Sequence, residues 1–420
     1  MYCLVDAVAF YASAEKVFDP AIRSKPVVVL TNNDGCICAI CPIARRLNIP
    51  KFQPYFKVKH LLAKHKVVIR SSNYELYADL SDKMMNVISR FCDTQHVYSI
   101  DEAFLQFNGF APLINDWHQY GQLIRRTVWR ETKLPVGVGF GPTPTLAKAA
   151  NHAAKKLNGF NGIAVIDSEQ ARQHILAAMD VADVWGVGKR LAKKLKLLNI
   201  NSALDLAKQT PKRMKRLFSV VLERTVNELN GIVCLNWDDV RQDKREIFST
   251  RSFGERLTDP VALKTALINH SIIVARKLRQ QRSLTKRLLL FVASSPHESH
   301  YYKKSLVYEL PVSSADSRVF AKAISEIFTQ LYQHNVRFYK CGVGALELSS
   351  QQFQQPDLFA PSQDNIKLME CLDSINKRYG YDTLTLASQQ QSQAWHMKRA
   401  FLSPQYTTRW QHLPKISCDL

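Results

Sequence analysis

The N-terminal part of the chain alternates short apolar runs with amphipathic stretches. Continuous apolar runs at residues 2–8 and 27–30 are typical of buried strands. Two further runs, 97–107 and 134–140, predict strands separated by an amphipathic helix over 117–130. The pattern predicts a first region of the α+β class.

The pattern changes twice further along the chain. Residues 168–238 have helical periodicity and short loops, and a polar, charged link follows at 239–246. Four strand-like segments then alternate with two helices and predict a small α/β module, with strands at 247–253, 287–293, 305–310 and 340–348. From residue 349 the chain is rich in Gln, Ser and Pro, which is typical of a linker that carries short recognition peptides.

Composition narrows the classes of partner. The 420 residues are 46% hydrophobic, enough for several cored domains, and 57 Lys and Arg against 36 Asp and Glu give a net charge of +21. Residues 186–216 alone hold ten basic residues and one acid, Asp205. This excess favours a polyanion, either nucleic acid or an anionic membrane. Because no apolar run approaches 18 residues and the N-terminus lacks a basic signal region, we expect a cytoplasmic protein.

Nine scattered cysteines do not predict a disulfide framework. Cys36, Cys38 and Cys41 form a local cluster, but no fourth Cys or His stands nearby at the spacing of a zinc site. Small buried thiols are the better interpretation of this cluster.

Three carboxylates interrupt apolar strands. Asp6 lies inside the run 2–8, and Asp101 and Glu102 interrupt the run 97–107. A single acid of this kind is usually a strand-end residue that faces water. Three acids at the ends of adjacent strands would instead share divalent cations, because burying uncompensated carboxylates is costly. Two Mg²⁺ ions held in this way would serve in-line phosphoryl transfer.

Longer motifs give the chain a resemblance to a known family. Asp6 precedes the residues AFYAS at 9–13, and SIDEA at 99–103 has the form of the second metal motif of Y-family DNA polymerases. The chain resembles the UmuC branch of that family, the catalytic subunits of bacterial DNA polymerase V. The blocks that carry this resemblance are NNDGC at 32–36, SSNYELYAD at 71–79, LAK at 146–148, ANHAAKK at 150–156, DVWGVG at 183–188, RSFGER at 251–256, MKRA at 397–400, LSP at 402–404 and YTTR at 406–409.

The resemblance implies roles for individual residues at the nucleotide site. The metal ligands would be the carboxylates of Asp6, Asp101 and Glu102 with the main-chain carbonyl of Ala7. Tyr11, which follows Phe10, matches the steric gate whose ring collides with a 2′-hydroxyl. Arg45 and Lys155 match the basic residues that hold the incoming triphosphate, a role suited to a fork donor and a point charge.

Three departures from the family pattern affect which properties of the family can be expected of this chain. Val8 stands where relatives often have Asn or Asp, and residues 40–43 replace a more polar stretch that is expected over the nascent base pair. Pro144 takes a position that is commonly Lys. The three carboxylates are present, so we expect activity.

Two regions are expected to hold DNA. Gly186 and Gly188 with Lys189 and Arg190 have the form of a helix-hairpin-helix, in which backbone amides approach a phosphate without reading bases. A Gly-X-Gly pair alone is weak evidence, but here it lies in a strongly basic region. The strand with Arg251 and Ser252, and the stretch 276–287 with six cations and no acid, would form the basic face of a little-finger domain. A solvated helix face remains an alternative for that stretch.

The implied architecture is a multi-domain α/β right hand. The boundaries are palm 1–9 and 75–167, fingers 10–74, helical thumb 168–238, linker 239–246, little finger 247–348 and C-terminal tail 349–420. The tail holds Gln355, Leu358 and Phe359, which match the Gln-x-x-Leu-Phe form of clamp-binding peptides. The implied partners are primer-template DNA, deoxynucleoside triphosphates, a dimer of cleaved UmuD, RecA and the sliding clamp, with no membrane.

The expected function is error-prone translesion DNA synthesis in the SOS response of a bacterium, at the nucleoid, with two Mg²⁺ ions as cofactors. Two alternatives stay open at this point. A nucleotide cyclase can place two-metal carboxylates on a comparable sheet, but it needs no duplex-binding region. A catalytically impaired, DNA-bound scaffold of the mutagenesis complex would fit the altered stretch 40–43, but not three intact carboxylates.

Overall fold

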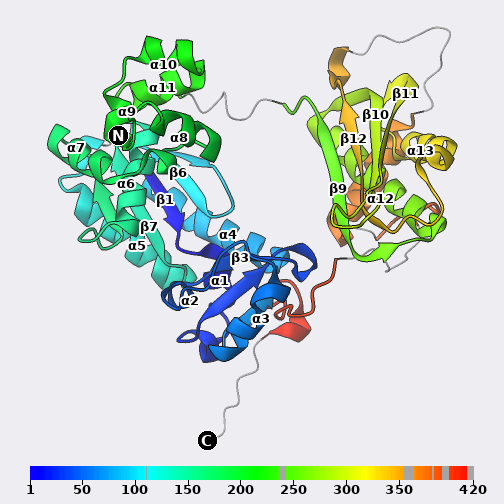
Figure 1. Ribbon diagram of the computed structural model, residues 1–420, viewed down its shortest axis with the longest axis horizontal. Coiled ribbons are helices and arrows are strands. Elements are labelled where there is room, and N and C mark those ends of the chain that lie inside the picture. The colour runs from blue at the N-terminus through cyan, green and yellow to red at the C-terminus, as the bar shows by residue number, and fades with distance from the viewer. Residues whose placement is uncertain (110, 236–242, 354–363, 381–382, 390–396, 414–420) are drawn as a thin grey trace, which may run out of the picture. The chain divides into compact units, whose positions relative to one another are not determined.

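The chain forms two compact units (Figure 1). The computed structural model describes residues 1–109, 111–235, 243–353, 364–380, 383–389 and 397–413. The first unit comprises Met1–Val240 and Arg399–Leu420, and the second comprises Arg241–Lys398. The chain therefore passes between the units twice, and its C-terminal residues belong with its N-terminal ones.

A five-stranded sheet of order β5-β6-β1-β7-β8 forms the centre of the first unit. The middle strand β1 pairs antiparallel with β6 and β7, whereas β7 and β8 are parallel. Residues 2–5 of β1 are buried, as expected for a central strand covered on both faces. The strands are β1 (Tyr2–Ala7), β5 (Thr94–Val97), β6 (Glu102–Gln106), β7 (Val136–Gly141) and β8 (Ile163–Val165).

Helices α5 (Trp117–Thr132) and α6 (Pro144–Lys156) cover opposite faces of this sheet. A Cβ atom at Gly141 would lie 2.7 Å from the Ala147 nitrogen of α6, so only glycine lets α6 approach the strand so closely. The neighbouring Phe140 contacts Gly121 of α5 instead. Because successive side chains of a strand point to opposite faces, the two helices lie on either side of β7.

A second, three-stranded sheet of order β3-β2-β4 and its helices complete the N-terminal part of the first unit. β2 is antiparallel to β3 and parallel to β4. Figure 1 shows α1, α2 and α3 around this sheet. The elements are α1 (Phe10–Glu15), β2 (Val27–Leu30), β3 (Ile37–Ile40), α2 (Pro42–Arg46), α3 (Tyr55–Lys64), β4 (Val68–Ser71) and α4 (Tyr74–Ile88).

The stretch 168–238 was predicted to be helical, and its described part is mainly helical in the structure. Its apolar residues share a core with one face of α6. Glu228 also ties this part to α6, since its carboxylate accepts from the Thr145 nitrogen at 3.0 Å and its carbonyl accepts from Thr143 Oγ1 at 2.9 Å. The helices are α7 (Glu169–Ala178), α8 (Lys189–Lys196), α9 (Ala203–Ala207), α10 (Pro211–Leu217) and α11 (Val220–Leu229).

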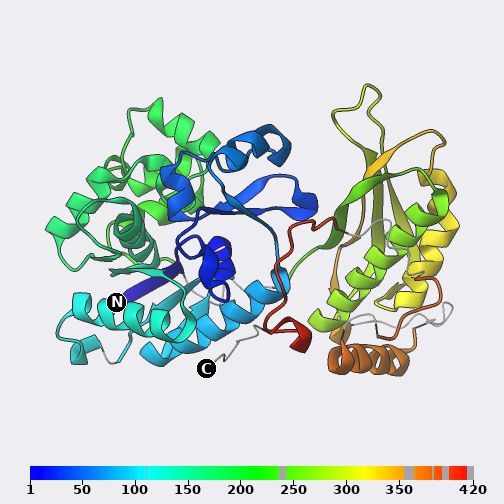
Figure 2. The same ribbon diagram turned by 90° about the horizontal axis from the view of Figure 1, so that it is seen from below.

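The second unit is a four-stranded antiparallel sheet of order β11-β10-β12-β9 with two helices, α12 and α13, packed on it (Figure 2). A short strand, β13, also pairs with β10. This arrangement confirms the predicted four-stranded module. The elements are β9 (Ile247–Leu257), α12 (Pro260–Gln281), β10 (Ser283–Ser294), β11 (Lys303–Ser314), α13 (Ser317–Leu331), β12 (Phe338–Leu346) and β13 (Ser349–Ser350).

One predicted strand is wrong in its extent. Residues 97–107 form the end of β5, a tight turn and β6, because the Tyr98 and Ser99 nitrogens both donate to the Glu102 carbonyl at 3.1 Å. Ser99 Oγ also donates to Asp101 Oδ1 at 2.6 Å and stabilises the turn. Asp101 therefore lies in a hairpin turn and Glu102 begins a strand.

The segment after residue 349 includes a packed helix among its described residues. It contains α14 (Ile366–Tyr379), whose Met369 and Leu372 are buried. Asp373 on this helix makes a two-pronged ion pair with Arg279, with both N···O distances at 2.7 Å. The expectation of a linker is therefore wrong for α14. The apolar face of this helix is buried against other residues, and local composition does not reveal such a contact.

Candidate functional site

The three predicted acids meet at one edge of the central sheet. Asp6 and Glu102 are paired residues of the antiparallel strands β1 and β6, and the Ala7 nitrogen donates to the Asp101 carbonyl at 2.9 Å. Strand pairing thus brings together residues that are far apart in the sequence. Asp6 lies near the end of β1, Glu102 is the first residue of β6, and Asp101 lies in the turn just before it.

Two lysines of α6 form ion pairs with two of these acids. Lys155 Nζ lies 2.5 Å from Asp6 Oδ1, and Lys148 Nζ lies 3.3 Å from Glu102 Oε1. A spacing of seven residues places the two lysines on one face of the helix, two turns apart. Gly137 makes room for this arrangement, because a Cβ atom there would lie 2.8 Å from Lys155 Cε.

Burial and mutual repulsion act on the carboxylates. Burial raises the pKa of Asp6, and Lys155 opposes that rise. Burial likewise raises the pKa of Glu102, and Lys148 opposes it. Asp6 and Asp101 add to the rise at Glu102 through like-charge repulsion. A cation that reached this edge would therefore relieve an unfavourable accumulation of negative charge.

The donor set fits a hard divalent cation. Carboxylate and carbonyl oxygens are the ligands that Mg²⁺ takes in proteins. Among the described residues, no group of three or more His, Cys, Asp or Glu side chains has the close spacing of a formed metal site. Lys155 and Lys148 occupy the positions beside Asp6 and Glu102 in this arrangement.

Tyr11 belongs to an aromatic cluster beside this edge. Ala9, with φ of 50°, is the N-cap residue of α1, and the first residue of the helix, Phe10, is buried. The half-buried Tyr11 ring stacks on Tyr77 with centroids 4.5 Å apart and an interplanar angle of 16°. Tyr74 meets Tyr11 edge-on at 6.3 Å. The position of the Tyr11 ring is thus set by α4 as well as by α1.

Arg45 is exposed on α2. It makes no ion pair within the part of the chain that the structure describes, so the structure does not join it to the carboxylates. The departures at 40–43 have a structural explanation, since Cys41 Sγ accepts from the Ala44 nitrogen at 3.4 Å and Pro42 occupies the first helical turn. Pro144 similarly starts α6 after the capping residue Thr143.

The predicted helix-hairpin-helix is formed. Gly186 has φ of +88°, which favours glycine, and Gly188 caps α8 without a side-chain hydrogen bond. Lys189 and Arg190 are exposed at the start of that helix. The helix N-terminus therefore presents free amide donors with two cations beside them.

Sequence analysis missed a cluster that joins this motif to the acids. Trp185 Nε1 donates to Tyr98 Oη at 3.3 Å, and Lys148 Nζ lies 4.3 Å and 4.6 Å from the centroids of the Tyr98 and Trp185 rings. A pocket of about 280 Å³ opens here between Asp6, Lys155 and Trp185. The seven-residue spacing of Lys148 and Lys155 was a signal for Lys148. Nothing local in the sequence indicated Trp185.

The predicted DNA-binding residues of the second unit lie on β9. Arg251 pairs with Cys341, and Ser252 pairs with Lys340. Consecutive strand residues point to opposite faces, so these two do not share a face. The stretch 276–287 is not one helix face, because it spans the end of α12 and the start of β10, and Arg279 is engaged by Asp373. Gln355, Leu358 and Phe359 lie outside the described residues.

Three comparisons place this geometry among known proteins. Family models described as the impB/mucB/samB family, its C-terminal domain and the IMS family HHH motif match residues 5–152, 244–358 and 169–200, and a domain of unknown function matches 367–416. Protein UmuC of Salmonella typhimurium is 41% identical over 99% of this chain and 100% of its own length. Protein ImpB of the same species is 37% identical over 99% of each chain.

More distant similarity extends to other polymerases. DNA polymerase IV 1 of Bacillus subtilis is 24% identical over 90% of each chain. A solved structure titled Y-family DNA polymerase chimera Dbh-Dpo4(243-245)-Dbh has a TM-score of 0.63 at 18% identity and covers 83% of this chain and 99% of its own. An insertion ternary complex of Dbh DNA polymerase has a TM-score of 0.52 at 19% identity, with the same coverage.

The fold and the relatives define a Y-family DNA polymerase, an enzyme of template-directed translesion synthesis. Within that class the chain belongs to the impB/mucB/samB family, the family of protein UmuC. The cyclase and the impaired scaffold find no support in these relatives. No helix among the described residues is long and apolar enough to cross a bilayer.

Proposed function

We propose that Asp6, Asp101 and Glu102, with the main-chain carbonyl of Ala7, hold two Mg²⁺ ions for nucleotidyl transfer to a primer end. When bound, the ions would activate the primer hydroxyl and stabilise the leaving pyrophosphate. Y-family polymerases in general depend on divalent metals. The observation that carries the proposal is the pairing of Asp6 with Glu102, with Asp101 in the adjoining turn.

Lys155 and Arg45 are proposed to hold the triphosphate. The Lys155 ammonium is already placed at the carboxylate edge by α6, where a phosphate chain next to the metal ligands would lie within its reach. Arg45 contributes an exposed fork donor from α2. Phe10 and Tyr11 form the floor beneath the sugar, and the Tyr11 ring excludes a 2′-hydroxyl.

The remaining surfaces are proposed to hold primer-template DNA. The α8 N-terminus with Gly186, Gly188, Lys189 and Arg190 binds a backbone phosphate, and Arg251 and Ser252 contribute from β9. Contacts of this kind do not depend on sequence, so they suit an enzyme that must accept damaged templates. The Dbh relative in a ternary complex supports binding of DNA and a nucleoside triphosphate by this fold.

The domain boundaries and partners are proposed as the sequence predicts them. The palm is 1–9 and 75–167, the fingers are 10–74, the thumb is 168–238 and the little finger is 247–348. Relatives named UmuC, ImpB and MucB support a role in the SOS response. A dimer of cleaved UmuD, RecA and the sliding clamp are the proposed partners, and the bacterial nucleoid is the proposed location. The clamp would bind Gln355, Leu358 and Phe359.

Primer extension on paired templates tests this function. The full chain, supplied with Mg²⁺, is expected to extend a primer on an undamaged template and past a lesion, and Asp101→Ala/Glu102→Ala is expected to abolish both reactions. Asp82→Ala, which removes an exposed acid on α4, is the matched control and should retain both. Extension by the double variant at the control's rate would refute the assignment.

A further inference from the structure

Residues 399–412, here called the C-terminal strap, dock on the part of the first unit that carries Tyr11. The strap joins the end of β4 through the main chain, because the Ser71 nitrogen donates to the Phe401 carbonyl and the Phe401 nitrogen donates to Ser71 Oγ, both at 3.0 Å. The Ala400 nitrogen donates to Asp34 Oδ2 at 2.8 Å. These bonds fix the strap in one register.

Aromatic contacts anchor the strap on either side of Ser403. Phe401 meets Tyr55 edge-on with centroids 5.7 Å apart, and Tyr406 stacks on Phe18 at 5.0 Å. Such aromatic pairs add stability beyond the area that they bury. The docking is therefore specific in its side chains as well as in its backbone.

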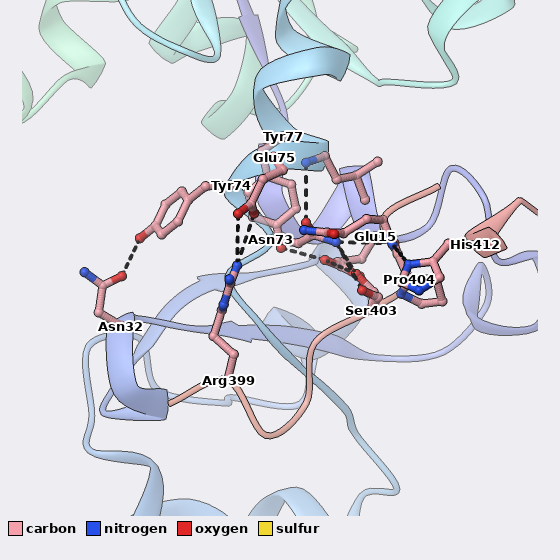
Figure 3. A network of polar contacts seen from close by, with 12 residues as sticks. Glu15, Asn32, Asn73, Tyr74, Glu75, Tyr77, Arg399, Ser403, Pro404 and His412 are labelled. Atoms are coloured by element: carbon pink, nitrogen blue, oxygen red, sulfur yellow. Dashed lines mark hydrogen bonds and ion pairs between the residues drawn. The ribbon is translucent and has the colours of Figure 1, made fainter. Parts of the chain in front are cut away.

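Ser403, in the middle of the strap, enters a buried polar network (Figure 3). Its hydroxyl donates to Glu15 Oε1 at 3.1 Å and accepts from Asn73 Nδ2 at 2.9 Å. Tyr77 Oη donates to the same Glu15 oxygen at 2.6 Å. A hydroxyl has one proton and can accept as well, so Ser403 meets both partners at once.

This network leads directly to the Tyr11 ring. Tyr77 is fully buried, and its ring is the one on which Tyr11 stacks at 4.5 Å. Asn73, the other partner of Ser403, caps α4 by accepting from the Leu76 nitrogen. The strap thus contacts the start of α4 directly, and it reaches the hydroxyl end of Tyr77 through Glu15.

A second contact holds the first turn of α4 from the exposed side. Arg399 Nη1 lies 3.1 Å from Glu75 Oε2, and Tyr74 Oη donates to Asn32 Oδ1 at 2.9 Å (Figure 3). The two tyrosines that surround Tyr11, Tyr74 and Tyr77, therefore lie on a helix turn that is held at several points, two of them from the strap.

Glu15 makes the contribution of Ser403 significant. The carboxylate is buried, and among the described residues its Oε2 has no hydrogen bond, only Arg70 Nε at 3.5 Å. Tyr77 and Ser403 are thus the donors to its other oxygen. Removing one donor leaves the buried carboxyl group of Glu15 with one hydrogen bond fewer, and this group would move with the Tyr77 hydroxyl to recover a partner.

We propose that the C-terminal strap is a positioning element for sugar selection, in which Ser403 acts through Glu15 and Tyr77 to hold the Tyr11 ring. The inference rests on the proposed role of Tyr11 beneath the sugar. It gives part of the matched domain of unknown function, 367–416, a role in the nucleotide site. Loosening the strap would let Tyr11 move aside, so that a 2′-hydroxyl is tolerated more readily.

The test compares ribonucleotide with deoxynucleotide insertion opposite one template base, using the full chain. Ser403→Ala should raise the ratio of the two kcat/KM values about tenfold, because a shift of about 1 Å near a reacting group has effects of up to a hundredfold. Ser403→Thr keeps the hydroxyl and should restore most of the discrimination. Thr408→Ala, an exposed strap residue, is the matched control and should leave the ratio unchanged.

A double variant separates this inference from the proposal on which it rests. If Tyr11→Ala raises the ratio and Ser403→Ala adds nothing to it, the two residues act through one path, as inferred. If Tyr11→Ala raises the ratio and Ser403→Ala alone does not, the strap inference is overturned while the gate stands. If Tyr11→Ala itself has no effect, the gate is refuted.

A surface variant covers the case in which Ser403→Ala fails to fold. Arg399→Glu removes the exposed ion pair with Glu75 without touching the core, and it should raise the ratio about threefold, since an exposed pair contributes little. Adding Glu75→Arg restores opposite charges and should reverse the rise. An unchanged ratio in Arg399→Glu, together with equal losses for both sugars in any Ser403 variant, would show a purely structural role.

Discussion

Lys155 Nζ lies 2.5 Å from Asp6 Oδ1, so a cation of α6 occupies the carboxylate edge on which the proposed chemistry depends. Lys148 has the same relation to Glu102 at 3.3 Å. The lysines lower the pKa values that burial raises at these two acids. This pairing favours the charged form of both acids and keeps a cation close to them.

Lys155→Met is expected to weaken nucleotide use. The substitution keeps the length of the side chain but removes the charge that would attract the triphosphate, so kcat/KM for an incoming nucleotide should fall at least about tenfold, mainly through KM. Lys156→Met is the matched control, because Lys156 is the next residue and pairs with Asp183 instead. Equal nucleotide affinity in the two variants, measured by steady-state insertion, would contradict the role of Lys155.

Tyr11→Ala is expected to relax sugar discrimination while extension with deoxynucleotides stays measurable. Removing the ring removes a clash and no group that takes part in the chemistry. Tyr11→Phe keeps the ring and should keep the discrimination. The measurement is ribonucleotide incorporation on a fixed template. If it does not rise in Tyr11→Ala, the ring is only part of the aromatic core around Tyr77.

Charge reversal at the helix-hairpin-helix should weaken DNA binding equally on all sequences. Lys189→Glu/Arg190→Glu removes two cations beside the α8 N-terminus. The slope of log K against log salt should therefore become shallower by the contribution of about two phosphate contacts. Lys57→Glu/Lys59→Glu on α3 alters the net charge identically and serves as the control. Weakening confined to one template sequence would indicate base recognition and contradict phosphate binding.

The second unit should lose stability as the pH falls below about 6.5. Burial, with Arg251 and Lys277 nearby, lowers the pKa of His270 to about 4, and its Nδ1 lies 2.9 Å from Ser249 Oγ. Between these values the unfolded chain binds a proton that the folded chain does not, so the free energy of unfolding decreases as the pH falls, by roughly 3 kcal/mol in all.

Hydrogen exchange of α12 peptides measures this effect. His270→Gln cannot titrate and should lose that part of the pH dependence, whereas His300→Gln, an exposed histidine of the same unit, should behave like the unchanged protein. Identical pH profiles for the unchanged protein and His270→Gln would show that His270 does not contribute.

Clamp stimulation should depend on the peptide at 355–359. Leu358→Ala/Phe359→Ala removes two apolar anchors and is expected to abolish stimulation by the clamp while sparing basal extension, because tethering raises the effective concentration at the primer end. Leu402→Ala, an exposed apolar residue of the strap, is the control. Full stimulation of the double variant would show that another segment binds the clamp.

Local patterns in the sequence located most of the framework. The apolar run at 27–30 is a strand with those bounds, and the two glycines before Lys189 mark the start of α8. The hairpin at Asp101 was missed, because its acids were interpreted as interruptions within one strand, whereas main-chain bonds to the Glu102 carbonyl form a turn there. The apolar pattern therefore singled out Asp101 but placed it inside a strand, whereas it lies in the turn before β6.

Long-range contacts were beyond the reach of pattern. The sequence predicted acids at the ends of adjacent strands, but not the strand register through which Asp6 and Glu102 meet. Ser403 stood in a recognisable motif, yet its contact with Glu15 crosses almost the whole chain and left no local signal. The hydrogen bond from Trp185 to Tyr98 likewise joins residues far apart in the sequence and left no local signal.

The most direct test of the account is single-turnover insertion of one nucleotide as Mg²⁺ is titrated. The unchanged chain should show a rate that rises with Mg²⁺ and saturates, whereas Asp101→Ala should be slower by about a thousandfold or more at every concentration, since removing a ligand removes the charge stabilisation that a metal supplies. Insertion by Asp101→Ala at the unchanged rate and with the same Mg²⁺ dependence would contradict the assignment of the carboxylates as the metal ligands.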